Sequence, residues 1–63
     1  TGKEGIVGEI GRAKTDIIKD GGSVFVHGEY WNAISEKKIK KDSTVKVISV
    51  KEMVLNVEET ESK

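Results

Sequence analysis

All three aromatic side chains of this 63-residue chain, Phe25, Tyr30 and Trp31, lie within one short run, and the single histidine, His27, lies among them. A large aromatic side chain either anchors a hydrophobic core or forms a contact surface. In a chain this short, the division of these rings between core and surface decides much of both fold and function.

Short alternating apolar runs, separated by turn signals, predict an all-β domain. Apolar residues do not recur at helical spacing over three turns anywhere in the chain. The expected strands cover residues 5–13, 23–27, 30–34, 44–50 and 53–57. A five-strand pattern of this length predicts a small closed barrel, either an SH3-like barrel or a five-stranded Greek-key barrel of the OB-fold type. We expect one barrel domain over residues 1–58 and a flexible tail over 59–63.

The connecting segments also suggest where the barrel is filled. Ile17 and Ile18 are expected to tuck in from the loop after the first strand, and Ile39 to plug one end of the barrel. Strand alternation places Val45 and Val47 on one buried face. The same rule is expected to bury three apolar residues of the last strand, which are Met53, Leu55 and Val57.

Side chains alternate between the two faces of a strand, so the residues of the aromatic run can be divided between core and surface in three ways. If Val24 and Val26 point inward without a break, Trp31 lies outside. The opposite choice buries Phe25 and Trp31, but it also buries the Glu29 carboxylate without a partner, which is costly.

A bend at Gly28-Glu29 gives the third and favoured solution, because a bulge or tight bend reverses the alternation. It buries the most apolar area and no unpaired charge. The core residues are then Val24, Val26, Trp31 and Ala33, with Trp31 as the central anchor. The residues left at the surface for a partner are Phe25, His27 and Tyr30.

Eleven basic residues balance eleven acidic ones, which argues against strong sequence-independent binding of nucleic acid. A lysine cluster adds to the possible partner surface, although such clusters are usually solvated turns. Its members are Lys37, Lys38, Lys40 and Lys41. The absence of cysteine, with one histidine, excludes a conventional zinc site. The spacing of Gly5, Gly8 and Gly11 differs from a dinucleotide-binding loop, and no cofactor is expected.

Catalysis finds little support in the residue pattern. Ser49 and Lys51 share a strand face, but nothing beside them supplies an oxyanion hole or a cleft. His27 and Glu29 are expected to share a face, an arrangement that is more often a surface hydrogen bond than an acid–base couple. We therefore expect no catalytic residues and no enzymatic activity in this chain.

A longer pattern resembles the C-terminal soluble domain of the NfeD family across nearly the whole chain. Its most specific part is Gly28-Glu29-x-Trp31-x-Ala33 with the strand before it. The full pattern is Gly5-x-Val7-Gly8, Ala13-x-Thr15-Asp16-Ile17, Gly22-x-Val24-x-Val26-x-Gly28-Glu29-x-Trp31-x-Ala33-x-Ser35, Val45-x-Val47-x-x-Val50 and Leu55-x-Val57.

The resemblance implies an OB-fold barrel at the C-terminus of a membrane protein, with a stomatin- or flotillin-like membrane protein as partner. Some long members also carry a Ser–Lys protease domain, but no residue of that domain is present here. Attachment to the membrane is expected through segments of a longer parent, and the side of the membrane stays open. Family members often have glycine where this chain has Asp42 and Glu52, and we expect Glu52 to avoid positive φ.

Two functions follow from these observations. The first is a non-catalytic protein-interaction domain of an NfeD-like membrane protein. The alternative is single-stranded nucleic acid binding on the face of the second and third strands, where OB folds bind such ligands.

Overall fold

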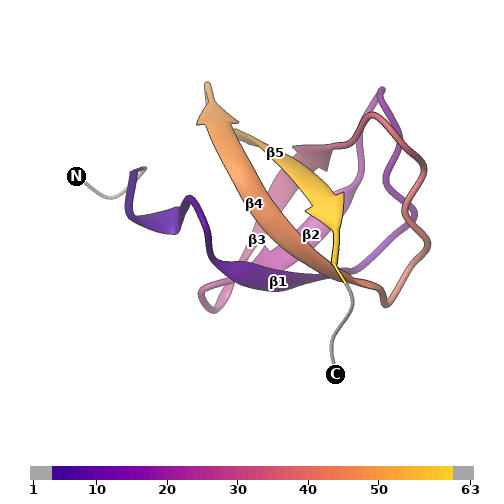
Figure 1. Ribbon diagram of the computed structural model, residues 1–63, viewed down its shortest axis with the longest axis horizontal. Coiled ribbons are helices and arrows are strands. Elements are labelled where there is room, and N and C mark those ends of the chain that lie inside the picture. The colour runs from indigo at the N-terminus through magenta and orange to yellow at the C-terminus, as the bar shows by residue number, and fades with distance from the viewer. Residues whose placement is uncertain (1–3, 61–63) are drawn as a thin grey trace.

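The computed structural model describes residues 4–60, which form a closed five-stranded barrel (Figure 1). A 3₁₀ turn, η1, precedes the strands. The elements are η1 (Glu4–Ile6), β1 (Ile10–Ala13), β2 (Ser23–Val26), β3 (Glu29–Ile34), β4 (Thr44–Lys51) and β5 (Val54–Glu59). The strand order around the barrel is β1-β2-β3-β5-β4. β3 and β5 run parallel and the other neighbours run antiparallel, so the expected OB-fold Greek-key barrel is confirmed.

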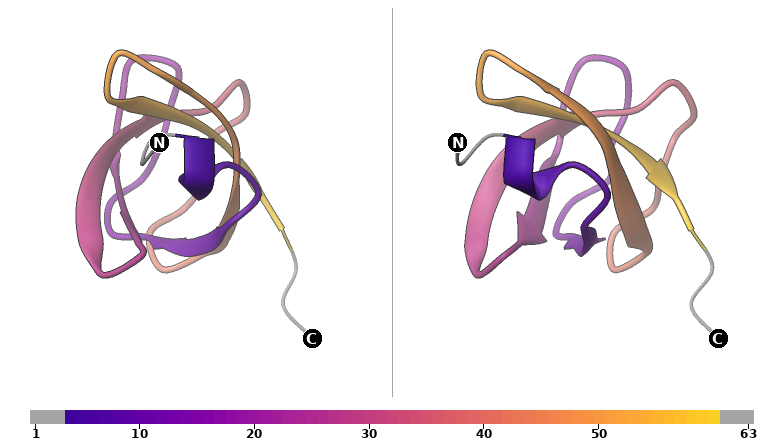
Figure 2. Two further views of the ribbon diagram at one scale, coloured as in Figure 1. Left: turned by 90° about the vertical axis from the view of Figure 1, so that its left-hand side faces the viewer. Right: turned by 60° about the vertical axis from the view of Figure 1, so that its left-hand side comes forward.

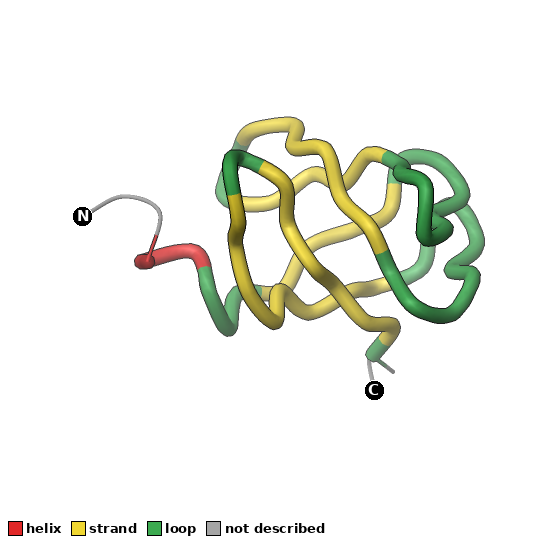
Figure 3. The backbone as a smooth tube through the Cα atoms, turned by 90° about the horizontal axis from the view of Figure 1, so that it is seen from above, coloured by secondary structure: helices red, strands yellow, loops and turns green. Residues whose placement is uncertain are grey.

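The two ends of the barrel differ. η1 lies across one end, at which the tight β2–β3 and β4–β5 turns also lie (Figures 1 and 2). The long connections 14–22 and 35–43 gather at the opposite end (Figure 3). Among residues 4–60, no helix is long and apolar enough to cross a membrane.

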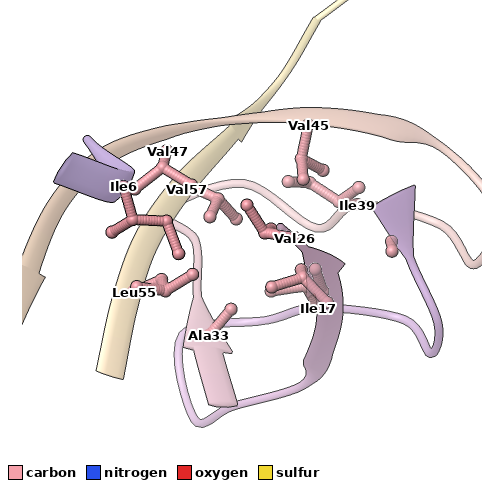
Figure 4. Close-up of a cluster of buried hydrophobic side chains, with 11 residues drawn as sticks. Ile6, Ile17, Val26, Ala33, Ile39, Val45, Val47, Leu55 and Val57 are labelled. Carbon is pink, nitrogen blue, oxygen red and sulfur yellow. The ribbon is translucent and has the colours of Figure 1, made fainter. Parts of the chain in front are cut away.

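Aliphatic side chains from every strand converge inside the barrel (Figure 4). Ile6 of η1 contributes at one end, and Ile17 and Ile39 contribute from the two long connections. The remaining core residues are Ala13, Val24, Val26, Ala33, Val45, Val47, Leu55 and Val57. Because the chain has no disulfide, this packing and the strand ladders hold the fold together.

The long connections are joined to each other by a short antiparallel bridge. The Ile17 N–H donates to the Ile39 carbonyl at 2.8 Å, and the Ile39 N–H donates to the Ile17 carbonyl at 2.9 Å. The expected burial of Ile17 and of the Ile39 plug is confirmed, whereas Ile18 is 43% exposed. The expectation for Ile18 is wrong because consecutive residues of an extended segment point to opposite sides.

Several strand boundaries differ from the expected ones. β1 begins at Ile10 rather than at residue 5, because η1 and a turn at Gly8, with φ of 89°, occupy the preceding residues. β5 continues to Glu59, and the Thr60 N–H still donates to the Thr44 carbonyl at 2.9 Å. The last part of the expected tail, residues 61–63, lies outside the described residues.

The β4–β5 connection is a two-residue turn, and it corrects two expectations. Glu52 and Met53 have φ of 53° and 68°, between the paired residues Lys51 and Val54. The type I′ geometry of such hairpins requires positive φ at both positions, so Glu52 adopts it although it is not glycine. Met53 is 56% exposed because it belongs to this turn rather than to the buried face of β5. Asp42, the other site at which glycine is usual in the family, also has positive φ, at 75°.

Relief of the strain in this turn should stabilise the protein. Met53→Gly removes a side chain from the left-handed region and buries no new group, so the free energy of unfolding should rise by about 0.5–1 kcal/mol. Chemical denaturation measures the change. The matched control is Lys51→Gly, in extended backbone next to the turn, which should destabilise the protein. Equal effects of the two substitutions would contradict the strained-turn interpretation.

Gly11 lets β1 lie close to β2 in the barrel wall. A Cβ atom at this position would overlap the Val26 side chain and would lie 2.6 Å from the Phe25 carbonyl oxygen. Close approach of a second strand is therefore the reason for a glycine inside β1.

Gly11→Ala should lower the free energy of unfolding by about 2 kcal/mol, because the barrel wall must shift to admit the methyl group. Thermal unfolding monitored by circular dichroism measures the loss. Gly5→Ala is the control, because a Cβ there meets nothing within 4 Å and the residue is exposed. A Gly11→Ala protein as stable as Gly5→Ala would show that the approach is looser than the structure indicates.

Candidate partner-binding face

The β2–β3 hairpin divides the aromatic run between core and surface. Val26 pairs with Glu29 across a two-residue turn, in which His27 and Gly28 have φ of 57° and 78°. The reversal expected at Gly28-Glu29 therefore occurs one residue earlier, at His27-Gly28, and it takes the form of the tight bend rather than the bulge. Directly paired residues share a face of the sheet. The pairing of Val24 with Trp31 therefore points both side chains toward the core.

The pairing of Phe25 with Tyr30 points both rings away from the core. Their centroids are 5.0 Å apart and the ring planes meet at 61°, an edge-to-face contact. Phe25 is 38% exposed and Tyr30 is 69% exposed. On the neighbouring strand β1, Arg12 lies opposite Phe25 and is exposed, as is Ile10 on the same face. We call Ile10, Arg12, Phe25 and Tyr30 the aromatic face.

His27 borders this face and pairs with a residue that the sequence did not indicate. Its Nε2 atom lies 3.6 Å from Oε1 of Glu9, not beside Glu29. Both side chains are largely exposed, so this contact contributes little to stability. The positive φ of His27 removes it from the strand alternation that would have placed it beside Glu29.

Trp31 faces inward but is not the central anchor that the sequence suggested. It is partly buried and packs against the core, whereas the largest fully buried side chains are Ile17, Ile39 and Leu55. Its Nε1 atom is buried without a hydrogen-bond partner among the described residues. Trp31 is nonetheless more buried than Phe25, as the favoured solution requires.

The lysine cluster lies at the other end of the barrel from the β2–β3 turn (Figure 1). Lys37, Lys38, Lys40 and Lys41 are all exposed on the connection between β3 and β4. Asp16 anchors this connection, because its Oδ1 accepts a hydrogen bond from the Lys41 backbone N–H at 2.9 Å and its Oδ2 lies 3.8 Å from the Lys38 Nζ. The structure thus separates the expected surface into an aromatic face and a lysine loop.

Two arrangements raised by the sequence can be compared with the structure, a Ser–Lys pair and a metal site. Ser49 and Lys51 are exposed on β4, and neither lines the groove described below. No group of three or more His, Cys, Asp or Glu side chains within residues 4–60 could hold a metal ion.

One surface feature has no counterpart in the sequence-based expectations. A groove of about 570 Å³ separates the segment 35–39 from the end of β5. The residues that line it are Ser35, Glu36, Lys37, Lys38, Ile39, Ile48, Asn56, Val57, Glu58 and Glu59. The groove exists because β5 is paired with β3 only as far as Asn56, whereas β5 itself ends at Glu59. To predict the groove from the sequence, one would have to know which residues of β3 and β5 pair with each other.

Residues 3–59 match the family described as the NfeD-like C-terminal, partner-binding domain. The chain belongs to the NfeD family. The resemblance noted in the sequence is thereby confirmed. No curated protein gave a significant match.

Three solved structures are similar to this NfeD domain. The C-terminal domain of stomatin operon partner protein 1510-C from Pyrococcus horikoshii is 33% identical, with a TM-score of 0.85 and 98% of each chain covered. The soluble domain of the Bacillus subtilis NfeD protein YuaF is 27% identical, with a TM-score of 0.78, over 89% of this chain and 75% of that one.

The third is the soluble domain of a Corynebacterium glutamicum membrane protein implicated in regulation of membrane protease activity. It has a TM-score of 0.87 over 90% of this chain and 95% of that one. Its identity of 22% supports the likeness of fold alone.

The partial burial of Trp31 predicts a graded response to substitution. Trp31→Ala should lower the free energy of unfolding by about 2 kcal/mol, less than a fully buried tryptophan would cost. Trp31→Phe should cost less than about 1 kcal/mol, because the lost Nε1 atom has no hydrogen-bond partner to leave behind. Urea denaturation measures both values. A larger loss for Phe than for Ala would contradict the described environment of Nε1.

Proposed function

We propose that this domain binds a stomatin- or flotillin-like membrane protein, as the soluble, non-catalytic part of a membrane-anchored NfeD protein. Three findings support the proposal. The family is described as partner-binding, one similar structure belongs to a stomatin operon partner protein, and two others are soluble domains of membrane or NfeD proteins.

The single observation that carries the choice of contact surface is the exposed Phe25–Tyr30 pair. Aromatic and arginine side chains are enriched among the residues that contribute most to protein interfaces. Phe25 and Tyr30 hold each other in a fixed edge-to-face contact, so little conformational entropy is lost when a partner covers them. Arg12 and Ile10 extend the same outer face on β1.

His27 and the lysine loop have accessory roles in this proposal. His27 forms the border of the aromatic face, where it is exposed beside Glu9. The four lysines of residues 37–41 lie at the other end and raise the rate of encounter with an acidic partner surface, without forming the close contact. Raising the salt concentration should therefore slow association more than it speeds dissociation.

The test measures binding of the purified domain to a stomatin-like membrane protein from the same organism, reconstituted in detergent or nanodiscs, by surface plasmon resonance. Tyr30→Ser and Phe25→Ala should each weaken binding by about 30-fold, the effect of losing a central interface residue. Ile18→Ala is the matched control, because Ile18 is similarly exposed on a long connection at the opposite end. It should leave the affinity unchanged.

Two results would overturn the proposal. One is the absence of binding by the folded domain at about 300 μM, a concentration at which even weak specific complexes form. The other is an equal loss in Ile18→Ala and Tyr30→Ser, which would remove the aromatic face from the interface. Saturable binding of a single-stranded oligonucleotide on Phe25 and Tyr30 would instead support the nucleic-acid alternative, which the balanced charge argues against.

A further inference from the structure

β5 is longer than the strand that accompanies it on one side. The parallel β3–β5 ladder ends where Ile34 pairs with Asn56. β5 nevertheless continues through Val57 and Glu58 to Glu59, and over these residues it pairs with β4. Within residues 4–60, no strand accompanies this last part of β5 on its other side.

The direction of the backbone groups at this edge follows from hydrogen bonds elsewhere. The Val47 N–H donates to the Glu9 carbonyl at 3.0 Å, and the Val47 carbonyl accepts from the Gly8 N–H at 2.8 Å. Both Val47 groups are thus used on the side away from β5, so the opposing Val57 forms a non-hydrogen-bonded pair with it.

Hydrogen bonding at the end of β5 gives the same direction for its backbone groups. The Thr60 N–H donates to the Thr44 carbonyl at 2.9 Å, on the β4 side. Because backbone direction alternates along a strand, the N–H and carbonyl of Glu59 point away from β4. They point toward the side on which the β3 ladder has already ended.

The groove of about 570 Å³ lies along this edge. The lining is more polar than apolar, and its exposed apolar surface comes mainly from Ile48, 42% exposed at the β-bulge of β4. The segment 35–39 forms the facing wall. A mostly polar groove next to an unpaired strand edge suits an extended polypeptide, whose backbone completes the ladder while its side chains contact the walls.

The charges around the groove favour a basic occupant. Glu58 and Glu59 are consecutive on β5, so a strand added alongside would have a carboxylate next to it on each face. Glu36 adds a third carboxylate. Of the two lysines in the lining, Lys38 is already paired with Asp16. The lining therefore carries three carboxylates against two amines, and Lys46 of β4 lies opposite Glu58 outside the lining.

We propose that the groove binds an extended segment of a protein partner, which adds as a strand along Val57–Glu59 and places lysine or arginine beside Glu58 and Glu59. The groove shares no residue with the aromatic face, so this inference goes beyond the function proposed above. An unpaired edge of this kind is a template for strand addition, and the flanking carboxylates select against acidic and promiscuous pairing.

The probe is a fluorescein-labelled octapeptide of alternating lysine and valine, measured by fluorescence anisotropy at about 150 mM salt to screen remote charges. It should bind saturably, and the ¹H–¹⁵N spectrum should show the largest shifts at Val57, Glu59 and the segment 35–39. The Glu59 amide should exchange with solvent more slowly in the complex. A peptide of the same sequence with N-methyl groups on alternate residues, which cannot donate to the edge, should lose the binding.

Charge reversal supplies the matched pair of variants. Glu59→Lys should weaken binding by about fivefold, because it places like charges side by side across the new strand pair. Glu29→Lys makes the same charge change at the β2–β3 turn, at the other end of the barrel, and should leave binding within about twofold. Tyr30→Ser should bind the peptide as the unchanged protein does.

Several results would overturn the inference. They are the absence of saturable binding, equal binding of the N-methylated peptide, equal losses in Glu29→Lys and Glu59→Lys, or shifts centred on Phe25 and Tyr30. The peptide experiments with the unchanged protein keep the test decisive even if Glu59→Lys unfolds. Failure here would leave the stomatin-like partner standing, because that proposal is measured on the other face with a different ligand.

Discussion

Barrel closure depends on a strand of four residues. β1 pairs with β2 on one edge and with β4 on the other, and Gly11 lies at its centre, facing the Val26 side chain. Without this double pairing, β2 and β4 would both be open edges, and the aliphatic core would be exposed along the seam. The absence of a side chain at Gly11 is what allows the wall to close.

The same closure determines where contact surface is available. Because the barrel interior is filled by aliphatic side chains, the two exposed rings lie outside as the result of a particular strand pairing. The His27-Gly28 turn produces it by setting Phe25 against Tyr30 on the outside and Val24 against Trp31 on the inside. Lengthening or shortening that turn by one residue would exchange which residues of β3 face the core and which face outward.

Sequence alone predicted the strands, the barrel and the division of the aromatic run, because alternation is a local rule with a period of two. The sequence also predicted the burial of Ile39 correctly, because a single isoleucine in a lysine-rich segment is the side chain of that segment that gains most from burial in the core. It failed at Glu52, where hairpin geometry outweighed the side-chain preference, and at Met53, which lies in the turn. It also failed to rank Trp31 against the aliphatic residues, because the amount of space inside a barrel is a tertiary property.

The sequence predicted the candidate binding surfaces less completely than it predicted the fold. The exposed pair Phe25 and Tyr30 followed from alternation, but the partner of His27 and the separation of the lysine loop depend on contacts between distant segments. The groove beside β5 depends on how far β3 accompanies it. The paired residues of the two strands lie 22 positions apart in the chain, for example Asn32 and Val54, and no local pattern encodes their register.

The bridge between Ile17 and Ile39 gives the groove a mechanical property. Ile39 belongs both to the core and to the wall of the groove. Its backbone is hydrogen-bonded to Ile17, and the neighbouring Asp16 accepts a hydrogen bond from Lys41 on the connection that forms the wall. The wall therefore cannot swing open without exposing the interior of the barrel, so opening would be coupled to partial unfolding. The width of the groove would therefore change little when the proposed peptide binds. A thin, extended segment would fit the groove better than a bulky one.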